Sequence, residues 1–331
     1  MRPIVAVLAL VGVILAAPGL TFNAGASVEY DDNIFRYSDR DESIFTYRVQ
    51  PDRFPFRSLD DAAVSVNGRL TWRTSLIAGH TTHLGVSAAG HEYVSNPVKS
   101  WLSGSVRARQ YLSRNLHFEA SYLLIPRYLV RYYHDPRQFT SYVPCTFAEH
   151  LIGLEAGWVP TRWLELTPKV RYEIDRYQAP FEFYNATAWR GGIDVSCAQF
   201  RAVGLDAAYE FKANRSRADT SPDVSYDQHD AVVSVRPKLG KLELEVGYGH
   251  TWRGYTASSL VDTTHAGRVD VTQSVFAGAT VALTHAVSVV GSYRFERRSS
   301  FSPYRADIDD VKDYAQNVIG LGIRVGGSGD R

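Results

Sequence analysis

The chain has 331 residues, and its 36 Lys and Arg against 35 Asp and Glu leave a formal net charge of +1. This balance offers no basic field for nucleic acid, which we exclude as a partner. The chain holds 20 Tyr, 15 Phe and 6 Trp, yet its mean hydropathy is only −0.21. A lipid-embedded β-barrel combines these features, because aromatic side chains gather at the membrane interfaces while the lumen stays polar.

The N-terminal residues have the features of a secretory signal. Arg2 supplies a positive charge, Ile4 to Ala17 form an apolar run, and small residues end it at Gly19. We therefore expect residues 1–19 to be a signal peptide that is cleaved on export. A membrane-anchoring helix is the alternative, but the run is shorter than the ~20 residues that span a bilayer.

From residue 20 onward, apolar and polar side chains alternate in one segment after another. Strict alternation is typical of strands that are apolar on one face and polar on the other. Most of these segments exceed the ~9–11 residues that a tilted transmembrane strand requires. The predicted strands span residues 20–35, 62–73, 81–93, 101–112, 116–126, 147–159, 163–175, 187–198, 202–213, 229–237, 241–253, 271–283, 286–297 and 314–325.

The connections between these strands alternate between long and short. Residues 36–61 form a long connection and residues 74–80 a shorter one, for example. Bacterial barrels have long extracellular loops and short periplasmic turns, with an even number of strands. We therefore predict an all-β fold, a single transmembrane antiparallel up-and-down β-barrel of about 14 strands. It would cover residues 20–325, with residues 326–331 as a short periplasmic tail.

A soluble all-β sandwich or propeller is the alternative fold. It is disfavoured because the apolar faces here carry many small residues, which lipid tolerates but a soluble core does not need. Pro168 falls inside a predicted strand, where it costs a ladder hydrogen bond or marks a bulge.

The polar faces of the predicted strands carry charge unevenly. In a ring of about fourteen strands, the third and tenth face each other, so a basic wall would oppose an acidic wall and create a transverse field. The other interpretation, that lumen charges pair with their neighbours, remains open. Glu243 and Glu245 would influence ion preference under the first interpretation. The candidate pore-lining residues are Arg69, Arg73, Arg107, Arg109, Lys169, Arg171, Asp206, Glu210, Glu243 and Glu245.

The sequence contains few signals of site chemistry. The histidines lack the spacing of a metal site, and no Gly-x-Ser-x-Gly element occurs, so we expect neither enzymatic activity nor a cofactor. Cys145 and Cys197 fall at opposite ends of the predicted barrel and are expected to remain unbonded. Barrel closure would bring the first and last long loops together, which suggests an extracellular cation cluster, against the default of solvated acidic loops. Its candidate ligands are Asp39, Asp41, Asp307, Asp309 and Asp310.

The segment from Gly25 to Arg36, which ends in Tyr30-Asp31-x-Asn33-Ile34-Phe35-Arg36, resembles the first-strand motif of a broad family of outer-membrane β-barrel porins. Relatives in that family occur with exopolysaccharide and capsule export systems. The close match covers about a dozen residues. The C-terminus departs from the usual barrel pattern, since Val325 rather than an aromatic residue ends the last predicted strand.

The resemblance implies an outer-membrane channel that passes polar molecules as a component of exopolysaccharide secretion. A general or sugar-selective diffusion porin and a plugged structural or assembly barrel are the alternatives, because a fold does not fix a function. Expected partners are outer-membrane lipid and lipopolysaccharide, the barrel-assembly machinery and polysaccharide-export proteins. The expected location is the bacterial outer membrane, with the signal peptide cleaved and both termini periplasmic.

Overall fold

The computed structural model describes residues 19–77, 79–200, 202–217 and 222–328. They form a closed antiparallel β-barrel of fourteen strands, as the alternation predicts. The signal peptide assigned to residues 1–19 lies almost entirely outside the described residues. Among the described helices, none is long and apolar enough to cross a membrane.

Each strand pairs with its two neighbours in sequence, and β1 pairs with β14 to close the ring. The strands are β1 Leu20–Asp31, β2 Asp61–Ile77, β3 His80–Tyr93, β4 Trp101–Tyr111, β5 Leu116–His134, β6 Tyr142–Thr161, β7 Leu164–Tyr177, β8 Ala186–Phe200, β9 Val203–Ser216, β10 Tyr226–Leu239, β11 Leu242–Tyr255, β12 Val269–Ala282, β13 Val287–Phe301 and β14 Tyr314–Ser328.

The apolar faces of the strands point outward. Val28 pairs with Val64 of β2 and with Leu321 of β14, and Val28 and Leu321 are 56% and 65% exposed. The alternating side chains, such as Arg69 beside Asn23, therefore point into the lumen. Charged side chains are expected to face the lumen, because a basic side chain that faces lipid at the bilayer midplane costs about 2–4 kcal/mol of stability.

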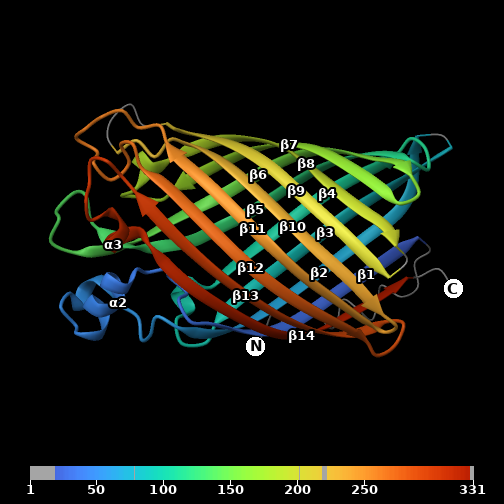
Figure 1. Ribbon diagram of the computed structural model, residues 1–331, viewed down its shortest axis with the longest axis horizontal. Helices are drawn as coiled ribbons and strands as arrows, with labels where there is room; N and C mark the ends of the chain where they lie inside the picture. Colours follow the sequence, from blue (N-terminus) through green and yellow to red (C-terminus); the bar gives the residue numbers. More distant parts are fainter. Residues whose placement is uncertain (1–18, 78, 201, 218–221, 329–331) are drawn as a thin grey trace.

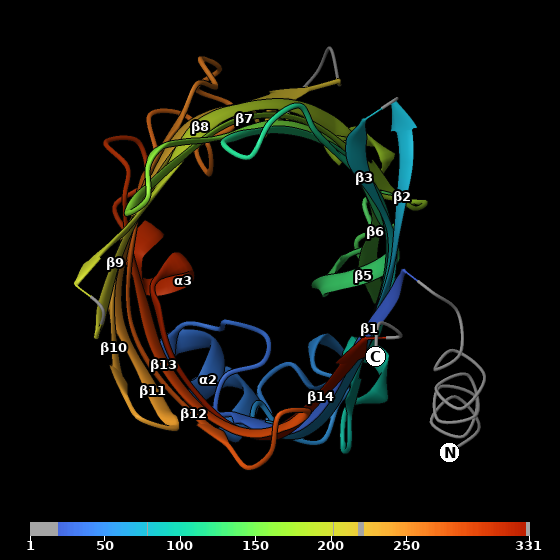
Figure 2. The ribbon, with the colours of Figure 1, turned by 90° about the vertical axis from the view of Figure 1, so that its right-hand side faces the viewer.

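The long connections gather at one end of the barrel and the short ones at the other, which we call the loop end and the turn end. The helices α2 Asp39–Thr46 and α3 Ile308–Lys312 belong to the first and last long connections. Figure 1 shows both helices at the left, beyond or within the ends of the strands, and Figure 2 shows them inside the outline of the ring. Three short 3-10 helices, η1 Pro51–Arg53, η2 Pro97–Lys99 and η3 Glu182–Tyr184, also belong to long connections.

Two boundaries differ substantially from the prediction at the loop end. The predicted loop 127–146 is mostly strand, because β5 and β6 continue beyond the ring as a hairpin. Register shifts between Ile125 and Tyr128 and between Leu129 and Arg131 interrupt the alternation on which the prediction relied.

Two further details differ from or refine the predicted strands, the end of β14 and the position of Pro168. The tail predicted at 326–331 begins inside β14, which runs to Ser328. Pro168 stays paired with Ile193 of β8, whereas the ladder with β6 passes from Glu155–Lys169 to Trp158–Leu166. The missing Pro168 N–H therefore falls at a break on the β6 side.

The first long connection folds onto the barrel mouth around an aromatic cluster. Phe35 stacks on Phe56 with ring centroids 4.1 Å apart, and Tyr37 meets Phe54 edge-on at 5.4 Å. These rings pack against Ala63, Tyr93 and Leu129 of the barrel wall. The cluster fixes the connection in place, since aromatic pairs contribute about 0.5–1.5 kcal/mol beyond their buried area.

Asn33 follows the end of β1 by two residues and turns the chain over the mouth. Its backbone N–H donates to Asp31 Oδ1 at 2.9 Å, and its side chain exchanges hydrogen bonds of 2.8 Å with the backbone of Tyr37. Its amide also donates to the carbonyl of Ala315 in β14 at 3.1 Å. The strand predicted as 20–35 therefore stops at Asp31, because local side-chain hydrogen bonds compete with the ladder.

The neighbouring acidic residues bind the opposite side of the same seam. Asp31 accepts a hydrogen bond from Gln316 Nε2 at 2.7 Å, and Asp32 accepts two from the backbone and side chain of Asn317, each at 2.7 Å. The motif that resembles the porin family thus clamps β1 to β14 at the loop end.

We expect Asn33→Ala to lower the free energy of unfolding by about 2–3 kcal/mol, because it leaves buried backbone groups unpaired. Denaturant titration of the refolded barrel would measure the change. Asn23→Ala is the matched control, since Asn23 is exposed on β1, and it should be nearly neutral. Equal stability of the two variants would contradict a clamping role for Asn33.

Candidate functional site

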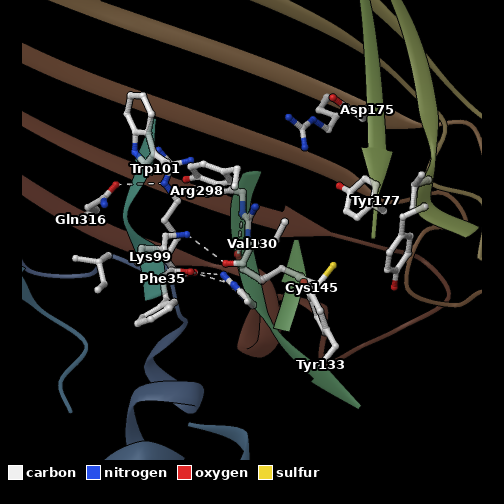
Figure 3. A pocket seen from close by; sticks show the side chains of 18 of the residues that line it. Phe35, Lys99, Trp101, Val130, Tyr133, Cys145, Asp175, Tyr177, Arg298 and Gln316 are labelled. Carbon is white, nitrogen blue, oxygen red and sulfur yellow. Dashed lines mark hydrogen bonds between the residues drawn. The ribbon is translucent and has the colours of Figure 1, made fainter. Parts of the chain in front are cut away.

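A cavity of about 920 Å³ occupies the lumen at the loop end, and we call it the chamber. Strands from most of the ring contribute to its wall, together with the first, second, fourth, fifth and last two long connections. Figure 3 shows Lys99, Arg298 and Gln316 on one side of it and Asp175 and Tyr177 on the other. Its position makes it the narrowed entrance of the barrel.

The chamber is strongly basic. Among the residues that the structure describes, three carboxylates line it, Glu29, Asp31 and Asp175. The basic side chains that line it are Arg36, Lys99, Arg131, Arg253, Arg268, Arg294, Arg298, Arg305 and Lys312. A surplus of fixed positive charge inside a low-dielectric wall raises the local concentration of anions.

Several of these cations are held in place by neighbouring groups. Arg268 forms a bidentate ion pair with Asp270 at 2.6 and 2.7 Å. Arg298 Nε donates to the carbonyl of Lys312 at 2.8 Å. In contrast, Arg294 is exposed on β13 and has no ion-pair partner within the described part of the chain. It therefore remains available to a solute.

Lys99 is buried between the first connection and the extended β5. Its Nζ donates to the carbonyls of Leu129 and Val130 at 2.7 and 3.3 Å, and it lies 4.7 Å from the ring centroid of Tyr128. Burial, reinforced by Arg36 and Arg131, lowers the pKa of Lys99 to about 7. The amine can therefore gain or lose its charge near neutral pH.

Lys312 experiences the same surplus of positive charge. Burial in the chamber, together with Arg268, Arg131 and Arg298, lowers the pKa of Lys312 in α3 well below its ordinary value. Lys312 has no carboxylate partner within the ranges that the structure describes.

Tyrosines form a continuous cluster on the opposite side of the chamber. Tyr177 and Tyr184 have ring centroids 5.6 Å apart, and Phe181 lies 6.2 Å from Tyr184 and 6.1 Å from Tyr133. The three tyrosine hydroxyls make no hydrogen bond within the described residues, so they can reach a solute. Asp175 lies beside them on β7.

The pore-lining residues predicted from the sequence lie outside the chamber, in the strands nearer the turn end. Many of them pair locally. Arg109 binds Glu119 at 2.7 Å and Lys169 binds Asp194 at 2.5 Å. Asp206 receives a bidentate ion pair from Arg236 at 2.6 and 2.7 Å, which neutralises part of the predicted acidic wall.

An alternating ionic network covers the lumen side of β6 to β9. Arg171 bridges Glu155 at 3.0 Å and Glu210 at 3.3 Å. Arg190 joins Glu210 to Glu173, which also binds Lys212 at 2.8 Å. These groups thus follow the interpretation in which lumen charges pair with their neighbours.

The remaining predicted residues make no ion pair among the described residues. They are Arg69, Arg73, Arg107, Glu243 and Glu245. The proposed effect of Glu243 and Glu245 on ion preference stays a prediction.

The prediction of an extracellular cation cluster is wrong. The two loops do meet, since Arg40 of the first binds Asp307 of the last at 3.3 Å. However, Asp41 is occupied by Arg53 at 2.5 Å and Asp307 also by Arg305 at 2.9 Å. The structure brings no group of three metal-ligating side chains together within its described ranges, Asp39, Asp309 and Asp310 included. Arginine side chains, rather than a metal ion, balance the charges of Asp41 and Asp307.

The two cysteines are free. Cys145 pairs with Arg131 in the extended hairpin and lines the chamber, whereas Cys197 pairs with Leu164 next to a short turn. They therefore lie at opposite ends of the barrel.

Sequence reasoning missed the residues of the chamber. Most of them fall at the loop-end tips of strands or in segments expected to be solvated loops, as Lys99 and Lys312 do. The available signal was a repeated Arg or Lys beside a Tyr near strand ends, as in Arg131–Tyr132–Tyr133.

No protein-family model matches the sequence, and no curated protein matches it. Among solved structures, the chain is similar to the outer membrane channel DcaP of Acinetobacter baumannii, with a TM-score of 0.52 and 11% identity over 93% of this chain and 96% of that one. It is equally similar to OmpT of Vibrio cholerae lacking loop L8, with a TM-score of 0.52 and 9% identity over 93% and 99%. These similarities show the fold, that of an outer-membrane barrel.

A bacterial polysaccharide outer membrane secretin is matched at a TM-score of 0.44 and 10% identity, over 91% of this chain and 97% of that one. This similarity is too weak to bear on function.

We expect anion preference to increase as the pH falls from about 8 to about 6, because Lys99 gains a proton near pH 7 and adds positive charge beside Arg36, Arg131 and Asp31. Reversal potentials in asymmetric KCl would measure the change, and Lys99→Gln should reduce it. The pKa of His265 is lowered by burial, so His265→Gln is the comparison variant. A pH response of Lys99→Gln equal to that of the unmodified protein would refute this assignment.

Proposed function

We propose that the chain is a non-enzymatic outer-membrane channel that passes polar solutes and prefers anions. The basic chamber is the observation that carries this proposal. Among the described residues, nine basic side chains and three carboxylates line the loop-end entrance, and five of the nine, Lys99, Arg253, Arg294, Arg298 and Lys312, form no ion pair there. An ion that crosses the barrel at this end must pass them, and the low-dielectric wall strengthens their field. The apolar outer surface meets the requirement of lipid for an apolar band.

In its more specific form, the proposal is an outer-membrane component of exopolysaccharide secretion. The motif from Tyr30 to Arg36 supports it by its resemblance to porins found with such systems. A general or sugar-selective diffusion porin is the second candidate. The chamber favours both over a plugged structural barrel, because it leaves space where a plug would lie.

The proposed orientation places the loop end outside the cell and both termini in the periplasm. It follows from the usual arrangement of bacterial barrels, in which long loops are extracellular and turns periplasmic. Lipid, lipopolysaccharide, the barrel-assembly machinery and polysaccharide-export proteins are the partners consistent with this location.

We expect the mature protein to fractionate with the outer membrane and to migrate faster on unheated than on heated gels, because the hydrogen-bonded ring resists detergent. Fractionation with paired heated and unheated samples tests this. Recovery in the soluble periplasmic fraction, without a heating shift, would refute the outer-membrane assignment.

We expect planar-bilayer recordings in asymmetric KCl to give an anion-selective reversal potential, and Arg294→Gln to reduce that selectivity because it removes an unpaired chamber charge. Arg297→Gln is the matched control, since alternation places Arg297 on the outer face of the same strand. Cation selectivity of the unmodified channel, or equal effects of the two variants, would contradict the role given to the chamber.

A further inference from the structure

The two sides of the chamber differ in chemistry. Arg268, Arg294, Arg298 and Lys312 belong to β13 and to the connections that precede β12 and β14. The tyrosine cluster belongs to β5, β7 and the connection after β7, and both strands lie six strands from β13 in a ring of fourteen, one in each direction. A cationic wall therefore faces an aromatic wall across the chamber.

We propose that the chamber binds carbohydrates that carry carboxylate groups, such as chains of uronic acids. This inference rests on the proposed channel function and names its substrate class. The carboxylate of each sugar would face the cationic wall, and the ring would lie against the tyrosines.

The available groups fit both parts of such a ligand. Arg294 and Lys312 lack a carboxylate partner in the part of the chain that is described, so a ligand carboxylate would supply one and would favour the protonated form of Lys312. Asp175 stands on the aromatic side, where its carboxyl group can form a hydrogen bond with a sugar hydroxyl. The volume of about 920 Å³ lies within the range of ligand-binding cavities and accommodates a disaccharide.

The tyrosines select a sugar over an aromatic acid of similar charge. Their rings present apolar faces, while the hydroxyls of Tyr133, Tyr177 and Tyr184 remain without a hydrogen-bond partner among the described residues. A sugar ring offers C–H groups to the rings and hydroxyls to the tyrosine oxygens. An aromatic carboxylate would leave these hydroxyls unpaired, which lowers its affinity.

The test measures binding to the purified full-length barrel in detergent micelles by isothermal titration calorimetry, independently of conductance. The probes are digalacturonate, the neutral disaccharide maltose and phthalate, an aromatic dianion of the same charge as digalacturonate. We expect digalacturonate to bind about tenfold or more tightly than either comparison ligand, because only it uses both walls. Equal binding of maltose would overturn the role of the cations, and equal binding of phthalate would overturn the choice of a carbohydrate.

Variants test the contributions of the cationic wall and the aromatic wall to binding separately. Arg294→Gln should weaken digalacturonate about tenfold, and the double variant Tyr177→Phe and Tyr184→Phe about threefold, because the latter removes neutral hydrogen bonds but keeps the rings. Tyr172→Phe, on the outer face of β7, is the control and should bind as the unmodified protein does. Unchanged binding in both chamber variants would overturn the site.

Planar-bilayer recordings distinguish failure of this inference from failure of the channel. An anion-selective channel that does not bind digalacturonate overturns the substrate class and leaves the proposed function standing. A barrel with no conductance overturns the proposed function itself.

Discussion

The structure depends on closing the seam between β1 and β14. A strand in lipid must pair every backbone N–H and C=O, because no water is present to replace a missing hydrogen bond, so an open sheet edge is excluded. The continuous ladder from Thr21–Ser328 to Asp31–Val318 meets this requirement. At the loop end, Asp31, Asp32 and Asn33 extend the attachment by side-chain hydrogen bonds to β14. The same residues turn the first connection over the mouth, so closure of the wall and narrowing of the entrance have one origin.

The narrowing explains why the chamber is basic although the whole chain is nearly neutral. Carboxylates nearer the turn end, such as Glu173 and Glu210, are engaged by arginines and lysines in a local network. At the loop end, inward-folded segments add Lys99 and Lys312 without a matching number of acids. The resulting asymmetry lies along the barrel axis as well as across it. A solute would meet the strongest positive field at the entrance, where the arginines lie inside a low-dielectric wall.

The loop-end hairpin and connections also supply the aromatic wall. Tyr133 stands on the part of β5 that continues beyond the predicted strand, and Tyr184 on the connection after β7. Neither position belongs to a regular membrane-spanning segment, where alternation assigns a face. Their rings converge through Phe181, which is buried between them. The chemistry of the entrance therefore resides in the irregular parts of the barrel, as it often does when a rigid scaffold positions functional loops.

The sequence by itself determined the ring of fourteen strands, their approximate bounds and their inward charges. It could do so because alternation with a period of two is a local property, and lipid allows only one orientation of each face. Tertiary structure alone decided which charges pair, as Asp206 does with Arg236, since register between strands sets those contacts. It also decided the chamber, and it replaced the expected cation cluster with arginine pairs at Asp41 and Asp307. These outcomes depend on how irregular segments fold across the mouth, which no periodic pattern records.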